Sequence, residues 1–371
     1  MLRMRSLMIG LLLLAASGCS DAIRINGGGA SFVYPAMLKW TRLYAKEFQT
    51  EIDYTSAGSG NGVSQMLART IQFGCTDAFI KNDQLDKFRE SGREILHIPL
   101  VMGGVVPIYN VPEAKQPLRF TGDVLARIYL GEIESWNHPD LQRLNPEVAL
   151  PDRKIAVAFR SDSSGTTAIF TEFLSKSNAT WGDKENGPGA GTTIKWRRGV
   201  GQRDNSGVAG YVGRSEYALG YAELMYARQN NLTYGAVEIA DSVKANAAER
   251  KKSKNDLPLN QRIFLQANLD TVSAAADAKL STILQTNPDL RYSLINSPGA
   301  NSYPIVGTNW CVFFTDQPRQ SGEAMIAFLK WATTFDGPGQ RAAQELGYAP
   351  LPRSLCELIQ KRLSEQVKWI D

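Results

Sequence analysis

The sequence predicts an α/β protein in which largely parallel sheets are flanked by helices. Short apolar runs typical of strands alternate along the chain with longer runs at helical spacing. At three places a strand-like run leads into a helix through a loop rich in glycine, serine or threonine. Ligands of parallel sheets bind beside the carboxyl ends of the strands, so these loops are candidate binding elements.

The first eighteen residues have the layout of a secretory signal. Arg3 and Arg5 form a basic start, and the apolar run over 7–16 is too short to span a bilayer comfortably. Small residues then lead to Cys19, which favours a bacterial lipoprotein signal whose cysteine is acylated; a plain signal peptide is the alternative. The chain carries a net charge of +4 with no long run of one sign, which argues against a nucleic-acid partner.

The N-terminal elements follow in order. A strand-like piece over 22–25 precedes a predicted glycine loop over 27–32, and apolar residues at helical spacing predict a helix over 34–48. A second strand-like piece over 52–54 leads through a Gly-x-Gly-x-Gly loop into a helix over 63–71. This spacing differs from the Gly-x-Gly-x-x-Gly of dinucleotide-binding loops, so no nucleotide site is expected.

The most informative run is Arg160-Ser-Asp-Ser-Ser-Gly-Thr-Thr167. It follows a strand-like run over 155–159 and precedes a helix-like run over 168–174. Ser163 or Ser164 suits the helix N-cap, and Gly165 lets the backbone approach a ligand. Free N–H groups at a helix start, with an arginine beside them, form a site for a tetrahedral oxyanion. An ordinary capped helix with a surface arginine is the alternative.

The remaining cysteines and the histidines limit the chemistry. Cys311 lies in a strand-like run and Cys356 in a C-terminal helix-like run. A disulfide between them is one possibility for an exported chain, and it would leave Cys75 as a buried thiol. The two histidines lie far apart and there is no Cys-x-x-Cys, so we expect no metal site and no cofactor.

Taken together, these segments resemble the periplasmic phosphate-binding proteins of bacterial high-affinity phosphate ABC transporters. The matching stretches run in family order over nearly all of the mature chain, at 27–32, 54–63, 73–78, 99–106, 128–136, 155–166 and 220–221. Each stretch alone is weakly specific, and their shared order is highly specific. The chain departs from the family pattern at Cys75 and Thr76, where a small pair is more usual, and at Phe79, where proline is frequent.

The resemblance implies a two-lobed fold of the venus-flytrap type, in which each lobe is a mostly parallel sheet flanked by helices. Lobe 1 would contain residues 19–101 and 306–371, and lobe 2 would contain residues 102–305. Two hinge crossovers would lie near 101–106 and 303–307. Gly103 and Gly104 suit either bending or close packing at the first crossover.

The resemblance also implies a phosphate site divided between the lobes. Asp162 would hold the arginine of this site in place. Asp77 would accept a hydrogen bond from phosphate, which still carries a proton at neutral pH, and would disfavour sulfate, which carries none. Read from the residues alone, Asp77 could equally be a solvated loop acid or a helix cap. The implied phosphate-binding residues are Ser31, Phe32, Ser59, Asp77, Arg160, Ser164, Gly165 and Thr166.

The implied function is that of a periplasmic receptor, monomeric and anchored to a bacterial membrane through lipid on Cys19. It would bind inorganic phosphate and deliver it to the permease and ATPase components of a phosphate ABC transporter. A receptor for a related protonated oxyanion, arsenate or a phosphate ester, is the alternative. An exported phosphohydrolase is disfavoured, because histidines are scarce and metal-ligand spacing is missing, so we expect no enzyme.

Overall fold

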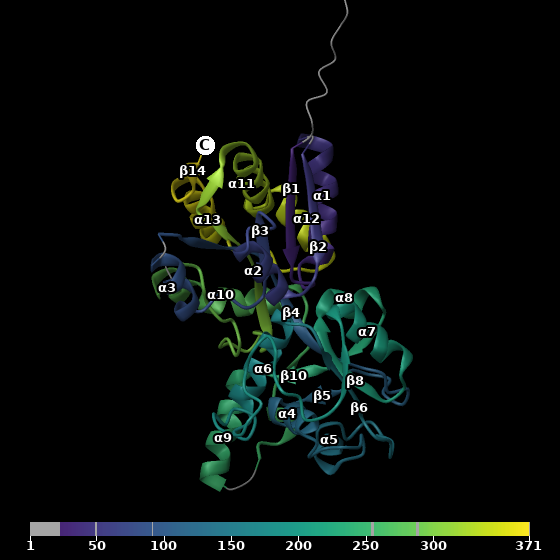
Figure 1. Cartoon of the computed structure of the whole chain (residues 1–371). Coiled ribbons are helices and arrows are strands. Elements are labelled where there is room, and N and C mark those ends of the chain that lie inside the picture. The colour runs from purple at the N-terminus through teal and green to yellow at the C-terminus, as the bar shows by residue number, and fades with distance from the viewer. Residues whose placement is uncertain (1–22, 49, 91, 254–255, 287–288, 371) are drawn as a thin grey trace, which may run out of the picture.

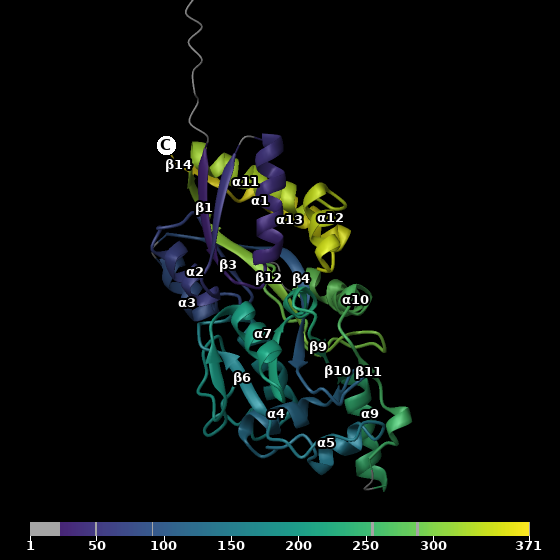
Figure 2. The ribbon, with the colours of Figure 1, turned by 90° about the vertical axis from the view of Figure 1, so that its right-hand side faces the viewer.

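A computed structural model describes residues 23–48, 50–90, 92–253, 256–286 and 289–370. The predicted signal over 1–18 and the predicted lipidation site Cys19 lie outside the described residues. The described chain forms an upper part and a lower part, with strand β4 (Ile95–Tyr109) at their junction (Figure 1). The same two parts are visible from the side in Figure 2.

One large mixed sheet runs through both parts, in the strand order β2-β1-β3-β12-β4-β8-β6-β7, with β9 also beside β4. β1 is parallel to β2 and β3, and β6 is parallel to β7 and β8. The crossing strands β4 and β12 are antiparallel to each other and to their neighbours β8 and β3. The other strands of this sheet are β1 Arg24–Gly29, β2 Glu51–Ser56, β3 Phe73–Thr76, β6 Ala156–Arg160, β7 Val200–Gln202, β8 Ala218–Glu223, β9 Thr233–Tyr234 and β12 Val306–Phe314.

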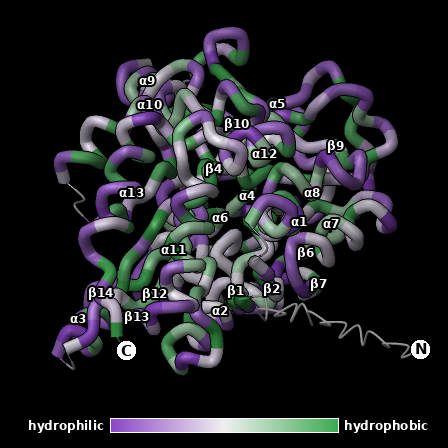
Figure 3. Tube along the Cα trace, turned by 90° about the horizontal axis from the view of Figure 1, so that it is seen from above, coloured by the Kyte–Doolittle hydropathy of each residue, from purple (hydrophilic) through white to green (hydrophobic). Residues whose placement is uncertain are grey.

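Helices pack around this sheet, and hydrophilic segments such as α3 lie at the periphery (Figure 3). None of the helices among the described residues is long and apolar enough to cross a membrane. The upper part carries α1 Tyr34–Phe48, α2 Ser59–Leu67, α3 Asn82–Glu90, α11 Arg319–Thr333, α12 Pro338–Leu346 and α13 Arg353–Glu365. The remaining helices are α4 Gly122–Leu130, α5 Pro139–Leu144, α6 Gly165–Ser177, α7 Asp204–Arg214, α8 Leu224–Gln229, α9 Ala240–Ser253, the 3₁₀ helix η1 Leu259–Gln261 and α10 Leu269–Thr286.

Two small sheets complete the architecture. In the lower part β10 (Ala236–Glu238) lies between β5 (Arg119–Phe120) and β11 (Phe264–Leu265). In the upper part β13 (Asp316–Pro318) pairs with β14 (Lys368–Ile370). The predicted α/β class is confirmed, with antiparallel strands at the junction of the two parts.

Strand β4 changes partner where it passes from one part to the other. It pairs with β12 as far as Gly104 and with β8 from Val105 onward. A Cβ at Gly103 would lie 2.9 Å from the Phe32 ring, and one at Gly104 would lie 2.7 Å from the Ala267 Cβ. Of the two roles predicted for these glycines, the structure therefore shows close packing.

The predicted loop over 27–32 is wrong for Gly27–Gly29, because these glycines form the end of β1, and right for residues 30–32, which lie between β1 and α1. All three glycines pair with β2 on one side and with β3 on the other. A Cβ at Gly27 would lie 2.1 Å from the Phe73 ring, so the ring packs directly on the strand backbone. The glycines that indicated a turn serve here to admit a large neighbour, and strand pairing overrides local propensity.

The segment after α10 contacts the upper part. Arg291 Nη1 donates to the Ile80 carbonyl at 2.7 Å, and Trp310 Nε1 donates to the Leu290 carbonyl at 2.8 Å. The sequence prediction assigns residues 290 and 291 to lobe 2, so the lobe boundaries remain a prediction.

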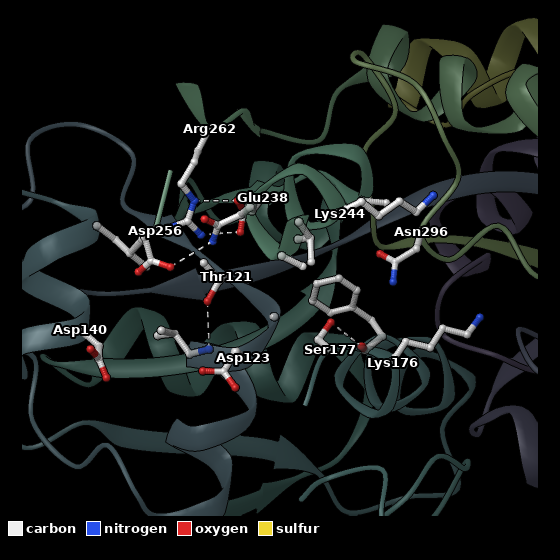
Figure 4. Close-up of a pocket in the computed structure, with 18 of the residues that line it drawn as sticks. Thr121, Asp123, Asp140, Lys176, Ser177, Glu238, Lys244, Asp256, Arg262 and Asn296 are labelled. Carbon is white, nitrogen blue, oxygen red and sulfur yellow. Dashed lines mark hydrogen bonds and ion pairs between the residues drawn. The ribbon is translucent and has the colours of Figure 1, made fainter. Parts of the chain in front are cut away.

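A buried ion pair stabilises the lower part beside a cavity of about 570 Å³ (Figure 4). Arg262 Nε donates to Glu238 Oε1 at 2.7 Å, and Nη2 donates to Oε2 at 2.6 Å. The two side chains are only 9% and 3% exposed. Such a bidentate pair compensates two charges that burial would otherwise make costly.

We predict that Arg262→Met lowers the free energy of unfolding by about 3–5 kcal/mol, because it leaves the Glu238 carboxylate buried without its cation. Urea unfolding measures this change. Arg341→Met is the matched control, since Arg341 and its partner Asp336 are 59% and 68% exposed. The control should lose less than about 1 kcal/mol, and an equally small loss in Arg262→Met would contradict the prediction.

Candidate functional site

Two helix starts meet at the junction of the two parts. α2 begins at Ser59 after β2, and α6 begins at Gly165 after β6. The Gly165 amide donates to Ser59 Oγ at 3.0 Å, joining positions 106 residues apart. A Cβ at Gly165 would lie 2.6 Å from both Ser59 Oγ and the Asp77 Cβ. Glycine is therefore required for this close approach.

The start of α6 agrees with its sequence prediction. Ser164 is the N-cap, and its Oγ accepts a hydrogen bond from the Thr167 amide at 3.1 Å. Gly165 and Thr166 follow it, and both are buried. The first amides of an α-helix lack partners within the helix and lie at the positive end of its dipole, so they favour an anion.

Arg160 brings the positive charge to this place from the end of β6. Its side chain is almost fully buried, with Nε donating to Asp162 Oδ1 at 2.8 Å and Nη2 donating to Asp162 Oδ2. Burial would raise the pKa of Asp162, but the bond to Arg160 and its charge hold that pKa below the ordinary value. The predicted role of Asp162, holding the arginine in place, agrees with this geometry.

The other terminal nitrogen of the Arg160 guanidinium, Nη1, does not take part in the pairing with Asp162. Among the residues that the structure describes, buried Nη1 has no hydrogen-bond partner. An unsatisfied buried donor on a cation is expensive unless an acceptor meets it, so this nitrogen indicates an anionic ligand.

Asp77 lies directly after β3 and is 5% exposed. Its Oδ1 accepts a hydrogen bond from Asn309 Nδ2 at 2.7 Å. Burial raises the pKa of Asp77 to about 7, although Asn309, the Arg160 charge and neighbouring hydroxyls act to lower it. The reading of Asp77 as a solvated loop acid is therefore wrong.

The hydroxyl groups at this junction share one property, which is that each already accepts hydrogen bonds from protein N–H groups. Ser59 Oγ accepts from the Gly165 amide and also from the Asp77 amide at 3.3 Å. Ser31 Oγ accepts from Asn205 through its amide at 3.3 Å and its Nδ2 at 3.0 Å.

The hydroxyls at the start of α6 also accept hydrogen bonds from protein N–H groups. Thr166 Oγ1 accepts from Asn205 Nδ2 at 3.2 Å, and Ser164 Oγ accepts from the cap bond already described. A hydroxyl that accepts in this way keeps its single proton for donation. The Ser59 and Thr166 hydroxyls bond to the Asp77 carboxyl and act to lower its pKa. The site thus combines hydroxyl donors with one carboxyl that can accept.

The side chain of Phe32 belongs to the hydrophobic core. Its ring is fully buried against the crossing strands, and its carbonyl accepts a hydrogen bond from the Tyr348 hydroxyl at 2.6 Å. The prediction for Phe32 concerns its backbone amide, which lies between Ser31 and the start of α1.

Sequence reasoning missed two asparagines. Asn205, at the start of α7, joins Ser31 to Thr166, and its Oδ1 accepts from the Glu223 amide at 3.0 Å. Asn309 orients Asp77 from β12. The polar run over 202–207 between a strand and a helix could have indicated the first. A lone amide inside the apolar run over 305–314 was the signal for the second.

Asp204 was missed as well, and it adds a second carboxylate beside the arginine. Its Oδ1 lies 3.7 Å from Arg160 Nη2 and has no hydrogen-bond partner within the described ranges. Its amide donates to Asp162 Oδ1 at 3.1 Å. The backbone of Asp204 is left-handed, with φ of 60°, a conformation that Asp and Asn tolerate better than most residues.

A cavity of about 830 Å³ extends from Asp77 and Ser59 along the junction, past Thr308 and Trp310. His97 does not line this cavity. Its Nε2 accepts a hydrogen bond from the Ile80 amide at 3.2 Å, and burial lowers the pKa of His97 to about 3.

Over the described part of the chain, no cluster of three or more His, Cys, Asp or Glu could hold a metal ion. The chemistry on offer is that of anion binding by a cation, hydroxyls and amides.

The pKa of Asp77 predicts a pH-dependent stability of the ligand-free protein. Its pKa is about 7 in the folded state against an ordinary value of 3.8, so between these pH values only the folded state keeps the proton. Its contribution to stability is therefore present at low pH and is lost as pH rises toward 7, with a slope of at most about 1.4 kcal/mol per pH unit.

Asp77→Asn should remove this contribution, which urea unfolding at pH 5, 6 and 7 measures. The control is Asp83→Asn, the same chemical change at an exposed position of α3. The control should keep the wild-type slope. Identical slopes for wild type and Asp77→Asn would show that Asp77 is ionised throughout this range.

Known proteins match this chain along most of its length. The family model described as "PBP superfamily domain" matches residues 16–334. The "Phosphate-binding protein PstS" of Haemophilus influenzae is 36% identical over 353 residues, covering 94% of this chain and 95% of the relative. The protein of the same name from Pasteurella multocida is 34% identical over 370 residues, covering 99% and 97%.

Solved structures share the fold at lower identity. A high affinity periplasmic phosphate-binding protein, PfluDING, solved with phosphate bound, matches with a TM-score of 0.67 at 18% identity. The match covers 91% of this chain and 93% of that one. It bears out the predicted two-lobed fold. The chain therefore belongs to the PBP superfamily and, within it, to the family of the PstS phosphate-binding proteins.

Proposed function

We propose that this protein binds inorganic phosphate between two lobes and delivers it to a phosphate ABC transporter for uptake. The observation that carries this proposal is the donor set at the junction. It consists of one guanidinium nitrogen without a partner among the described residues and of four hydroxyls whose oxygens already accept protein N–H groups. Such a set matches an oxyanion with several acceptor oxygens and little else.

In the proposed site, Arg160 supplies the charge and Asp162 orients it. Ser31, Ser59, Ser164 and Thr166 donate through their hydroxyls and Phe32 through its backbone amide. Gly165, whose own amide donates to Ser59 Oγ, lets the helix start come close to the ligand. Asp77 accepts a hydrogen bond from the proton that phosphate keeps at neutral pH. Sulfate would place an unprotonated oxygen against this carboxyl, which leaves a buried acceptor unpaired at a cost of roughly 1–3 kcal/mol.

The proposed lobes are residues 19–101 with 306–371, and residues 102–305. With these boundaries, the bonds from Gly165 to Ser59 and from Asn205 to Ser31 both cross from one lobe to the other. They support the view that the arrangement described here is the closed form. Closure of this kind completes the donor set and excludes water.

The proposed protein is exported, with residues 1–18 as signal, and it is held at a bacterial membrane through lipid on Cys19. It acts in the periplasm as a monomeric receptor rather than as an enzyme. Its partners are the permease and ATPase components of the transporter. The support is the signal-like N-terminus and the family to which the chain belongs.

Calorimetry with phosphate and with sulfate as competitor tests the proposed site. Wild type should bind phosphate with no competition from sulfate. In Asp77→Asn the amide can donate to a sulfate oxygen, so discrimination should fall by about 10- to 100-fold. Asp83→Asn should behave as wild type. Equal affinity of the wild type for the two anions would overturn the role given to Asp77, and no phosphate binding would overturn the function.

A second prediction concerns Asp204. Its carboxylate competes with the ligand for Arg160, so Asp204→Asn should tighten phosphate binding by about fivefold, the size of a roughly 1 kcal/mol charge–charge interaction. The gain should be larger at pH 8 than at pH 6, because phosphate carries more charge at pH 8. Calorimetry at both pH values measures it, with Asp152→Asn, at an exposed position, as control. Weaker binding by Asp204→Asn would contradict the prediction.

A further inference from the structure

Two buried cysteines face each other across neighbouring strands. Cys75 of β3 and Cys311 of β12 are direct partners in an antiparallel ladder. Direct partners of this kind point their side chains to the same face, with Cα atoms about 4.5–5.5 Å apart. Disulfides need Cα atoms about 4.4–6.8 Å apart, so the register is compatible with a bridge without movement of the backbone.

The surroundings of the pair are those of a protected structural bridge. Both cysteines have no exposed surface. Burial raises the pKa of the Cys311 thiol, and the Cys75 thiol beside it raises that pKa further. Two such thiols do not react with external reagents once the sheet has formed, because the thiolate is the reactive form.

Cys356 lies elsewhere, which leaves the predicted pairing of Cys311 with Cys356 unsupported. Its Sγ donates to the Leu351 carbonyl at 3.5 Å from the first turn of α13. In the structure Cys75, Cys311 and Cys356 are all separate buried thiols, and only Cys75 and Cys311 are direct partners in a ladder.

We propose that Cys75 and Cys311 form a cross-strand disulfide in the exported protein. The proposal depends on the periplasmic location given under Proposed function, because that compartment is oxidising. A thiolate of one cysteine attacks the disulfide of an exported dithiol–disulfide oxidoreductase. The other cysteine then attacks the mixed disulfide and releases the oxidant as a dithiol, which has taken up two electrons and two protons. Since both sulfurs are buried in the sheet, the exchange occurs before β3 and β12 pair.

The bridge would secure the part of the sheet that carries Asp77. Asp77 follows Cys75 by two positions and Asn309 precedes Cys311 by two, so the disulfide and the Asp77–Asn309 hydrogen bond join the same two strands. Cys75 and Cys311 are 236 positions apart in the chain. A bridge across so long a loop strongly restricts the unfolded chain.

Thiol mapping of the full chain, purified from the periplasm without reductant, tests the proposal. The protein is alkylated with iodoacetamide in guanidinium, with or without prior reduction, and digested for mass spectrometry. Cys356 should be alkylated without reduction, and Cys75 and Cys311 only after it. Reduction should lower Tm by on the order of 10 °C.

Cysteine variants and a phosphate-binding measurement distinguish failure of the proposed disulfide from failure of the proposed function. Cys75→Ala should free Cys311 for alkylation and abolish the fall in Tm on reduction, whereas Cys356→Ala should keep both the bridge and that fall in Tm. Alkylation of both Cys75 and Cys311 in the unreduced wild type, or a linked peptide containing Cys311 and Cys356, overturns the proposal. Phosphate calorimetry on the same sample distinguishes the two proposals: a bridged protein that does not bind refutes only the function, and a binding protein with free thiols refutes only the bridge.

Discussion

Burial of the Arg160 guanidinium is the constraint on which the site depends. A buried charge is tolerated only when it is paired and hydrogen-bonded, and Asp162 fulfils both conditions at the end of the same strand. The pairing uses one edge of the guanidinium and leaves Nη1 directed elsewhere. Around the guanidinium lie neutral hydroxyls together with the carboxyls of Asp77 and Asp204.

The contacts that hold the two parts together are the same contacts that prepare the site for an anion. Ser59 and Ser31 accept N–H groups from the opposite side of the junction, and this fixes their oxygens as acceptors. Their protons are thereby left for donation. The same hydrogen bonds therefore join the two parts and orient the hydroxyl donors. The missing Cβ of Gly165 allows the start of α6 to come close enough to Ser59 and Asp77 for this.

Asp77 depends on a different element, the pairing of β3 with β12. Asn309 reaches Asp77 from a strand near the other end of the chain, while burial raises the pKa of Asp77 to about 7. A carboxyl so placed accepts a proton from its ligand more readily than it tolerates a bare negative oxygen. The same strand pair brings Cys75 opposite Cys311, so the placement of Asp77 and the proposed disulfide depend on the same strand register.

Local features of this protein were predictable from neighbouring residues, since caps and helical spacing depend on bonds within a few positions. α1 spans 34–48 as predicted, Ser164 is one of the two predicted N-caps of α6, and the strand predicted over 155–159 is observed as Ala156–Arg160. Predictions failed where distant segments decide the outcome, as at Gly27–Gly29. Asn205, Asn309 and the facing cysteines could be recognised only in the folded chain. Their partners are set by strand pairing and by the meeting of helix starts, and no local pattern encodes which segments meet.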